Sequence, residues 1–126
     1  MDLYREHILD HYENPRNFGK LARHDRTAEV FNDFCGDRIA IFINLHEKPG
    51  KSDQQIVHEI SFEGEGCAIS MASASILTEF AKGKAVVELQ RLKSHDIVSL
   101  LGVELTPVRL KCALLSWEVL QKALAQ

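Results

Sequence analysis

Three cysteines and one aspartate are the residues of this sequence whose side chains can jointly bind a metal ion. Cys35 and Asp37 belong to the stretch FCGD. Cys67 ends the stretch GEGC, and Cys112 ends the stretch RLKC. Three thiolates and one carboxylate match the ligands of a four-coordinate metal site in number and type. The set therefore predicts a site for zinc or for iron–sulfur chemistry.

The mixture of ligand types predicts how firmly such a site would hold its metal. Sulfur is a soft ligand and the Asp37 carboxylate is a hard one, so the site should exchange its metal more readily than a site of four sulfurs. A permanent structural zinc site more often shows paired C-x-x-C motifs, and the sequence has none. The spacing favours a metal or cluster that is assembled and then released.

Simpler interpretations of the same residues stay open on spacing alone. A single free cysteine is more often a buried core residue than a ligand. Asp37 follows Gly36 and is equally typical of a turn. The stretch GEGCAIS has two glycines before a helix, but it lacks the third glycine and the Lys-Ser/Thr ending of a phosphate loop.

The histidines are expected to have structural places. His58 shares the alternation of a strand and is expected to pack within it. His7 and His11 have the spacing of a helical zinc pair, but HILDH lacks the glutamate of H-E-x-x-H. Both are therefore expected on the solvated side of the first helix, and His95 is expected at the start of a later one.

The elements that must position these residues follow from hydrophobic periodicity. Residues 3–12 predict a short helix, ended by Asn14 and Pro15. Alternation predicts a strand over residues 39–45 with both faces partly buried, and a second, antiparallel strand over residues 56–62. The stretch EKPGKSDQ is the expected turn between them, and residues 28–34 add a third strand.

Helices are predicted from Ala68 onward. The first closes on Gly83, and shorter ones cover residues 86–92 and 95–101. The last begins with Thr106 as its cap and Pro107 at its first position. Its expected buried stripe is Leu110, Ala113, Leu114, Trp117, Leu120 and Leu124. Cys112 lies outside that stripe, in the direction of Arg109 and Ser116. Strands followed by helices predict an α+β sandwich.

Composition narrows the class of protein. With 126 residues and an ordinary hydrophobic content, the chain is expected to form one domain over residues 1–126. A net charge of -3 gives no reason to expect nucleic acid as a partner. No apolar run approaches the length of a membrane helix, and the N-terminal residues are charged, so a cytoplasmic protein without a membrane partner is expected. Three cysteines make no disulfide framework.

Several stretches together resemble a known family. FCGD, GEGCAISMASASILTE, FAKGK and RLKCALLSWEVLQKAL resemble the three cysteine motifs of the IscU/NifU-type iron–sulfur cluster assembly scaffolds. The opening YREHILDHYENPRNFG resembles the N-terminal segment of that family. The resemblance covers nearly the whole chain, and three motifs in the same order are highly specific.

The resemblance implies a fold, a site and partners. It implies a SufE/NifU-like α+β sandwich, with a three-stranded antiparallel sheet covered by helices on one side. It implies that iron, a transient [2Fe–2S] cluster or zinc is bound by Cys35, Asp37, Cys67 and Cys112. A pyridoxal-phosphate-dependent cysteine desulfurase would supply sulfur, with Cys112 as the persulfide acceptor, and finished clusters would pass to apo iron–sulfur proteins.

Two departures from the IscU pattern leave a second function open. Lys111 stands where many IscU proteins have histidine, and RLKC with CAISMASAS is closer to the SufU branch, although the extra segment usual in SufU is absent. The alternative is therefore a zinc-dependent sulfurtransferase, in which zinc holds Cys35, Asp37 and Cys67 while Cys112 takes sulfur. A small structural zinc domain is a third reading.

The stretch LTPVR resembles the chaperone-recognition stretch of IscU. Thr106 replaces a proline and Arg109 replaces a lysine, so dependence on a chaperone pair is left open. Arg109 is instead expected to orient the Asp37 carboxylate. The last helix offers an apolar stripe wide enough only for its own core, so a monomer or weak dimer is expected.

Overall fold

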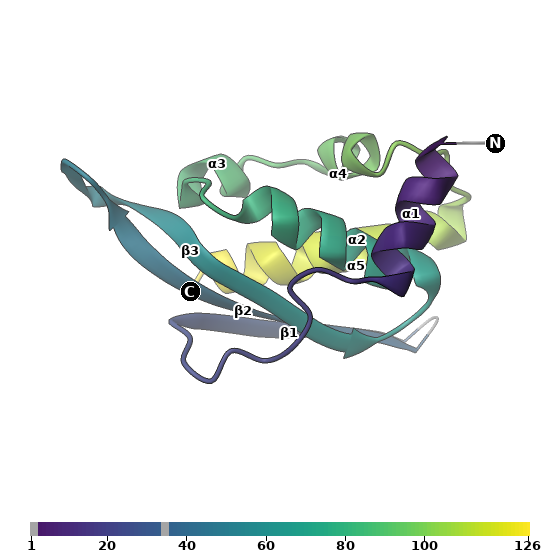
Figure 1. The fold of residues 1–126 in the computed structure, drawn as a ribbon, viewed down its shortest axis with the longest axis horizontal. Coiled ribbons are helices and arrows are strands. Elements are labelled where there is room, and N and C mark those ends of the chain that lie inside the picture. Colours follow the sequence, from purple (N-terminus) through teal and green to yellow (C-terminus); the bar gives the residue numbers. More distant parts are fainter. Residues whose placement is uncertain (1–2, 34–35) are drawn as a thin grey trace.

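The computed structural model describes residues 3–33 and 36–126 of the chain. Over these residues the strands precede all but the first helix, as predicted (Figure 1). In chain order the elements are α1 (Leu3–Glu13), β1 (Arg26–Asn32), β2 (Asp37–Lys48), β3 (Lys51–Glu65), α2 (Ala68–Ala81), α3 (Val86–Gln90), α4 (Ser94–Leu101) and α5 (Pro107–Leu124). None of the described helices is both long and apolar enough to span a membrane.

The sheet is antiparallel with strand order β1-β2-β3, and the helices cover one of its faces. Figure 1 shows α2 and α5 against the sheet, with α3 and α4 beyond them. The core between these layers includes the fully buried side chains of Ile39, Ile41 and Ile43 from β2, together with Leu77 from α2 and Leu120 from α5. Full burial of such a side chain contributes about 1.5–3 kcal/mol. The predicted α+β fold is confirmed.

The central strand is buried on both faces, as its alternation predicted. Its second face is covered by the segment between α1 and β1. The ring of His24 lies 5.2 Å from that of Phe42, centroid to centroid. The side-chain amide of Asn44 donates a 2.7 Å hydrogen bond to the carbonyl of Arg23. This segment explains why Phe42 is buried although it points away from the helices.

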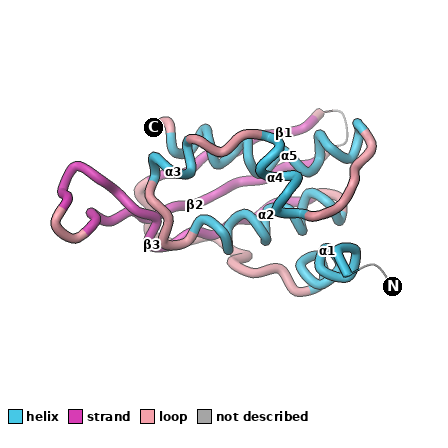
Figure 2. Tube along the Cα trace, turned by 90° about the horizontal axis from the view of Figure 1, so that it is seen from above, coloured by secondary structure: helices cyan, strands magenta, loops and turns pink. Residues whose placement is uncertain are grey.

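The turn between β2 and β3 is much shorter than the stretch EKPGKSDQ suggested. Both strands continue outward, and only Pro49 and Gly50 lie between them. Gly50 has a φ of 79°, which glycine adopts without strain. The extended hairpin projects beyond the helices (Figure 2). Polar residues can continue the two strands there because the strands satisfy each other's backbone groups without a core beneath them.

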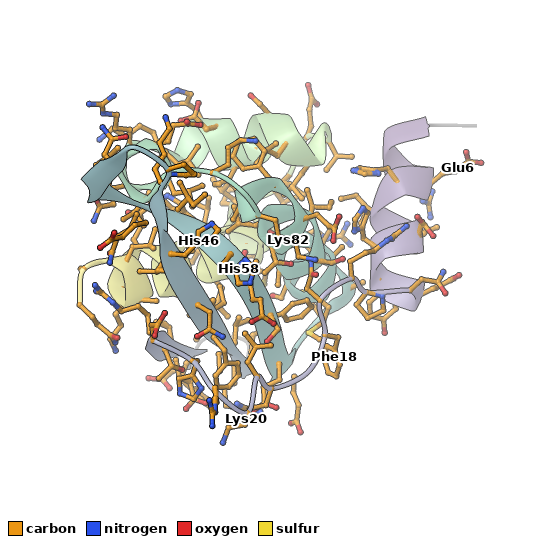
Figure 3. The ribbon with its side chains drawn as sticks, turned by 60° about the vertical axis from the view of Figure 1, so that its left-hand side comes forward. Glu6, Phe18, Lys20, His46, His58 and Lys82 are labelled. Atoms are coloured by element: carbon orange, nitrogen blue, oxygen red, sulfur yellow. The ribbon has the colours of Figure 1, made fainter. Side chains whose placement is uncertain are left out.

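A β-bulge overturns the prediction that His58 packs inside the sheet. Asn44 pairs with Glu59 but Leu45 pairs with Val57, so His58 is the extra residue on β3. The bulge shifts the alternation, and Val57 is buried where His58 is exposed. Figure 3 shows His58 beside His46 on the hairpin, and their ring centroids are 4.8 Å apart.

The buried face of helix α5 overlaps the predicted stripe only in part, because Ala113, Leu120 and Leu124 are buried as predicted. Thr106 and Pro107 start the helix as predicted, and the Thr106 hydroxyl accepts the backbone N–H of Arg109. Leu110, Leu114 and Trp117 are only half-buried. The buried residues are Cys112, Ala113, Leu115, Ser116, Val119, Leu120, Ala123 and Leu124. Because α5 packs against both the sheet and α2, its buried face is wider and rotated. Cys112 lies inside that face instead of outside it.

Helix α1 docks on α2 through a histidine that was expected in solvent. His11 is only 8% exposed, and its Nδ1 lies 2.7 Å from the Ser75 hydroxyl oxygen. The same hydroxyl accepts the backbone N–H of Arg16 at 2.8 Å, so its own proton is available for His11. Burial, with Arg16 and His7 nearby, lowers the pKa of His11 below its ordinary value. His11 is therefore a neutral, structural residue.

Candidate metal centre

The predicted ligands come from segments far apart in sequence that meet at one end of the sheet. Asp37 is the first residue of β2, and its neighbour Arg38 pairs with Glu65 at the end of β3. Cys67 follows two residues later, at the N-cap position of α2. Cys112 lies in the second turn of α5, which packs against α2. The antiparallel pairing of β2 and β3 therefore brings Asp37 beside Cys67.

Asp37 is a buried carboxylate held by the start of α2. Asp37 is only 3% exposed. Oδ1 accepts the backbone N–H of Cys67 at 3.2 Å, and Oδ2 accepts the Ser70 hydroxyl. A helix N-terminus favours negative charge, because its first N–H groups have no partner within the helix. The structure thus places the Asp37 carboxylate where a negative charge is stabilised.

The two described cysteines differ in exposure. Cys67 is exposed, whereas Cys112 is only 4% exposed. The Sγ atoms of Cys67 and Cys112 and a carboxylate oxygen of Asp37 all lie within 4.8 Å of one another. The three side chains therefore form one group, open to solvent on the Cys67 side.

The spacing within this group suits a metal ion. A zinc ion bound tetrahedrally by sulfur at about 2.3 Å and oxygen at about 2.1 Å holds those two atoms about 3.6 Å apart. The Cys67 Sγ and Asp37 Oδ2 atoms are 3.7 Å apart. The two side chains fit zinc, and they offer the sulfur and oxygen ligands that iron also accepts.

The fourth predicted ligand, Cys35, lies outside the described residues. On its flanks, Asn32 pairs with Asp37 at the end of the β1–β2 ladder, and the Gly36 N–H donates to the Asn32 carbonyl at 2.8 Å. Gly36 has a φ of 74°, in the left-handed region that glycine favours. The assignment of Cys35 stays a prediction from its motif.

Two neighbours of the ligand group were not singled out from the sequence. Ser70 follows Cys67 by three residues, a spacing that puts both on one face of a helix. Gly66 lies against the site so closely that an added Cβ would be 3.0 Å from Oδ1 of Asp37 and 3.2 Å from Cβ of Ser70. The i,i+3 spacing was a usable signal for Ser70, whereas the role of Gly66 depends on tertiary contacts.

Arg109 does not take the place expected for it. Its side chain is exposed, and among the described residues no hydrogen bond or ion pair joins it to Asp37. It instead lines a hollow of about 350 Å³ with residues of α1 and α2, including Arg5 and Ile69. The groups that orient the Asp37 carboxylate include the Cys67 N–H and the Ser70 hydroxyl.

Comparison with known proteins gives consistent relatives. The family described as NifU-like N terminal domain matches residues 3–126. The chain is 40% identical to the zinc-dependent sulfurtransferase SufU of Bacillus subtilis, over 141 aligned positions that cover 98% of this chain and 90% of the relative. It is 35% identical to the iron–sulfur cluster assembly scaffold protein IscU of Escherichia coli, with 97% of this chain and 91% of the relative covered.

Solved structures show the same fold. The crystal structure of FiSufU from Fervidobacterium islandicum has a TM-score of 0.74 and 27% identity, and the match covers 94% of both chains. A NifU-like protein from Brucella abortus has a TM-score of 0.71 over 97% of this chain and 92% of its own, at 20% identity. The second likeness bears on the fold alone.

Proposed function

The chain belongs to the NifU-like N-terminal domain family, and from this premise we propose that it is a scaffold for iron–sulfur cluster assembly. It accepts sulfur from a cysteine desulfurase, assembles a labile [2Fe–2S] cluster and transfers the cluster to apo-proteins. The observation that carries the proposal is the group of Asp37, Cys67 and Cys112, whose ligand atoms lie within 4.8 Å of one another. Cys35 completes the proposed ligand set as its fourth member.

Iron and the cluster are cargo in this proposal, and the protein supplies ligands that can be given up. The two sulfurs bind iron strongly, whereas the Asp37 oxygen is a harder, more exchangeable ligand. Cys67 is exposed, so an acceptor's thiolate can approach the cluster from that side. The group therefore suits temporary storage better than permanent structure.

Cys112 is the proposed acceptor of sulfur. Its thiolate attacks the outer sulfur of the desulfurase persulfide, the S–S bond of the donor breaks, and the donor cysteine leaves as a thiolate. Because Cys112 is only 4% exposed, the start of α5 must shift before a protein-bound persulfide can reach it. Cys67 is the more accessible sulfur in this conformation, so a comparison of the two cysteines tests the assignment directly.

A zinc-dependent sulfurtransferase is the second candidate function. It is favoured by the similarity to the Bacillus subtilis protein of that name and by the fit of Asp37 and Cys67 to zinc geometry. In this reading zinc would hold Cys35, Asp37 and Cys67, and Cys112 would leave the metal to take sulfur. Zinc would then keep the thiolates deprotonated and ordered, and the protein would relay sulfur without assembling a cluster.

The two candidate functions are separated by one anaerobic reaction. The purified protein is mixed with a cysteine desulfurase, cysteine, ferrous iron and a thiol reductant, with and without prior removal of zinc. Visible absorbance and circular dichroism follow the reaction, and apo-ferredoxin is then added. A [2Fe–2S] spectrum that moves to the ferredoxin supports the scaffold. Zinc-dependent stimulation of the desulfurase without a cluster would replace it by sulfur relay.

Three further points stay predictions from the sequence. They are a single domain over residues 1–126, a cytoplasmic location, and a monomer or weak dimer as the working state. The proposed partners are a pyridoxal-phosphate-dependent desulfurase and apo iron–sulfur proteins.

A further inference from the structure

The Ser70 hydroxyl occupies the centre of the ligand group without belonging to the predicted ligands. Ser70 is 0% exposed. Its Oγ contacts Oδ2 of Asp37, lies 3.5 Å from the Cys67 sulfur, and lies 3.2 Å from the backbone carbonyl oxygen of Cys112. One hydroxyl thus touches all three described residues of the proposed metal centre.

The hydroxyl has one proton and two oxygen acceptors, and the Cys67 sulfur beside it can donate or accept. Both Asp37 Oδ2 and the Cys112 carbonyl oxygen lie within hydrogen-bond distance, but Ser70 can donate to only one of them at a time. A hydrogen bond to a charged acceptor is about twice as strong as one to a neutral acceptor. In the metal-free protein, the Ser70 hydroxyl therefore donates its hydrogen bond to Oδ2 of Asp37 and not to the Cys112 carbonyl.

The oxygen that Ser70 holds is the oxygen placed to bind a metal. Oδ2 is the Asp37 atom that lies 3.7 Å from the Cys67 sulfur, close to the separation expected for two ligands of one ion. Oδ1 is held separately by the Cys67 N–H, at 3.2 Å. The Ser70 hydroxyl and the position suited to a metal therefore meet at the same oxygen, Oδ2, while Oδ1 is held by the Cys67 N–H.

We propose that Ser70 is a positioning residue that makes the Asp37 ligand exchangeable by competing with the metal for Oδ2. When Asp37 binds the metal, the Ser70 hydroxyl turns to the Cys112 carbonyl; when Asp37 leaves, the hydroxyl turns back. This inference rests on the proposed metal centre and adds the means of release.

The benefit of this exchange is that no buried polar group is left unpaired. A buried carboxylate without a hydrogen-bond donor is strongly disfavoured. A carboxylate that left the metal for purely apolar surroundings would therefore rebind the metal at once. Ser70 gives Asp37 a donor in the metal-free state. It also has its own acceptor ready when the metal is bound, because the Cys112 carbonyl is within reach.

A matched control lies one turn further along α2. Ser73 is also buried, and its hydroxyl donates to the Ala113 carbonyl of α5 at 2.6 Å. Both serine hydroxyls lie within hydrogen-bond distance of adjacent carbonyls of α5, but among the described residues Ser73 contacts Ala113 and Ser116 and not Asp37. Ser73→Ala removes a buried hydroxyl of the same helix, together with its hydrogen bond to α5, without touching Asp37.

The test is an anaerobic zinc titration of the full chain against a chromophoric chelator, for wild type, Ser70→Ala, Ser73→Ala and Ser70→Thr. We expect Ser70→Ala to bind zinc about tenfold more tightly than wild type and to release it to the chelator correspondingly more slowly. Ser73→Ala should keep the wild-type zinc affinity, although its melting temperature falls. Ser70→Thr restores the hydroxyl and should return the affinity toward that of wild type.

Cobalt(II) absorption of the same variants supplies a readout independent of affinity. The sulfur-to-cobalt charge-transfer intensity should be the same in wild type and Ser70→Ala, because the number of thiolate ligands does not change. The ligand-field bands of Ser70→Ala should shift, since one oxygen ligand loses its competing hydrogen bond.

The possible results separate this inference from the proposed site. Weaker zinc binding by Ser70→Ala, or the same affinity in Ser70→Ala and Ser73→Ala, would overturn the role of Ser70 and leave the metal centre standing. A wild-type protein that binds neither zinc nor cobalt would overturn the metal centre itself.

Discussion

Two groups of buried hydroxyls on α2 make a useful comparison. Near the start of the helix, the Ser70 hydroxyl contacts the Asp37 carboxylate, the Cys67 sulfur and the Cys112 carbonyl. This group opens to solvent at Cys67. About one turn later, Ser73 and Ser75 form hydrogen bonds to α5 and α1. Both groups are polar and buried, so burial of polar residues alone does not mark a functional site.

The difference lies in what the hydroxyls meet. In the second group, the partners are carbonyl, amide and neutral imidazole groups that pair within the protein and stabilise helix packing. In the first group, an anionic oxygen and two sulfurs converge within 4.8 Å, which is the arrangement a cation stabilises. Variants at the two places should therefore separate metal binding from stability.

The largest effect is expected for Cys67→Ser. Removal of a sulfur ligand should weaken zinc binding by more than about 100-fold, because a neutral serine hydroxyl is a much weaker ligand for zinc than a cysteine thiolate. Cys67 is exposed, so the free energy of unfolding of the metal-free protein should change by less than about 0.5 kcal/mol. Chelator titration and urea unfolding measure the two quantities. Unaltered zinc affinity in Cys67→Ser would remove Cys67 from the site.

Asp37→Ala should make a bound cluster more persistent. Without the carboxylate, a thiol from the buffer can take its position and bind iron more tightly than oxygen does. The visible spectrum of the assembled cluster should then decay several times more slowly in the presence of apo-ferredoxin. Ser70→Ala should change the lifetime in the same direction. A cluster lost faster from Asp37→Ala would contradict the role of an exchangeable oxygen ligand.

Gly66→Ala should moderately lower both the zinc affinity and the free energy of unfolding. The new methyl group would meet the Asp37 carboxyl carbon and Oδ1 at 3.0 Å. Such overpacking costs about 1–3 kcal/mol and displaces the carboxylate from the zinc position. Urea unfolding and zinc titration should both show a loss, whereas Glu65→Ala, at an exposed neighbour, serves as the control. Zinc affinity like that of wild type in Gly66→Ala would show that the carboxylate can move freely.

The smallest effect concerns the packing of α1 and depends on pH. Because the pKa of folded His11 lies below its ordinary value of 6.5, the unfolded chain takes up the proton first as the pH falls. Stability should be complete above about pH 6.5 and decrease below it. Thermal melts of His11→Gln should show a weaker pH dependence than wild type between pH 7 and pH 5. His95→Gln, whose side chain is exposed, is the control, and an unchanged slope in His11→Gln would exclude His11 as the cause.

Much of this architecture was predictable because local sequence signals agree with it. The alternation of Ile39, Ile41 and Ile43 gave the central strand, and Thr106 with Pro107 gave the start of α5. The cysteine motifs predicted that Asp37, Cys67 and Cys112 would come together, and their ligand atoms do lie within 4.8 Å of one another. Each of these features depends on residues close together in the chain.

The incorrect predictions concern features that depend on distant partners. A bulge displaced His58 from the core, and packing of α1 on α2 buried His11 against Ser75. The buried face of α5 is set by two neighbours, so the helix period alone misplaced Cys112. Ser70 escaped notice for the same reason, because its importance comes from Asp37, which is 33 residues away.

The most direct test of the metal centre is X-ray absorption at the zinc edge of the zinc-loaded, anaerobically purified protein. The proposed ligand set of Cys35, Asp37, Cys67 and Cys112 predicts three sulfurs at about 2.3 Å and one oxygen at about 2.0–2.2 Å. In Cys67→Ser, the number of sulfurs should fall to two. A zinc shell made only of nitrogen and oxygen, or one unchanged in Cys67→Ser, would contradict the site on which the proposed function rests.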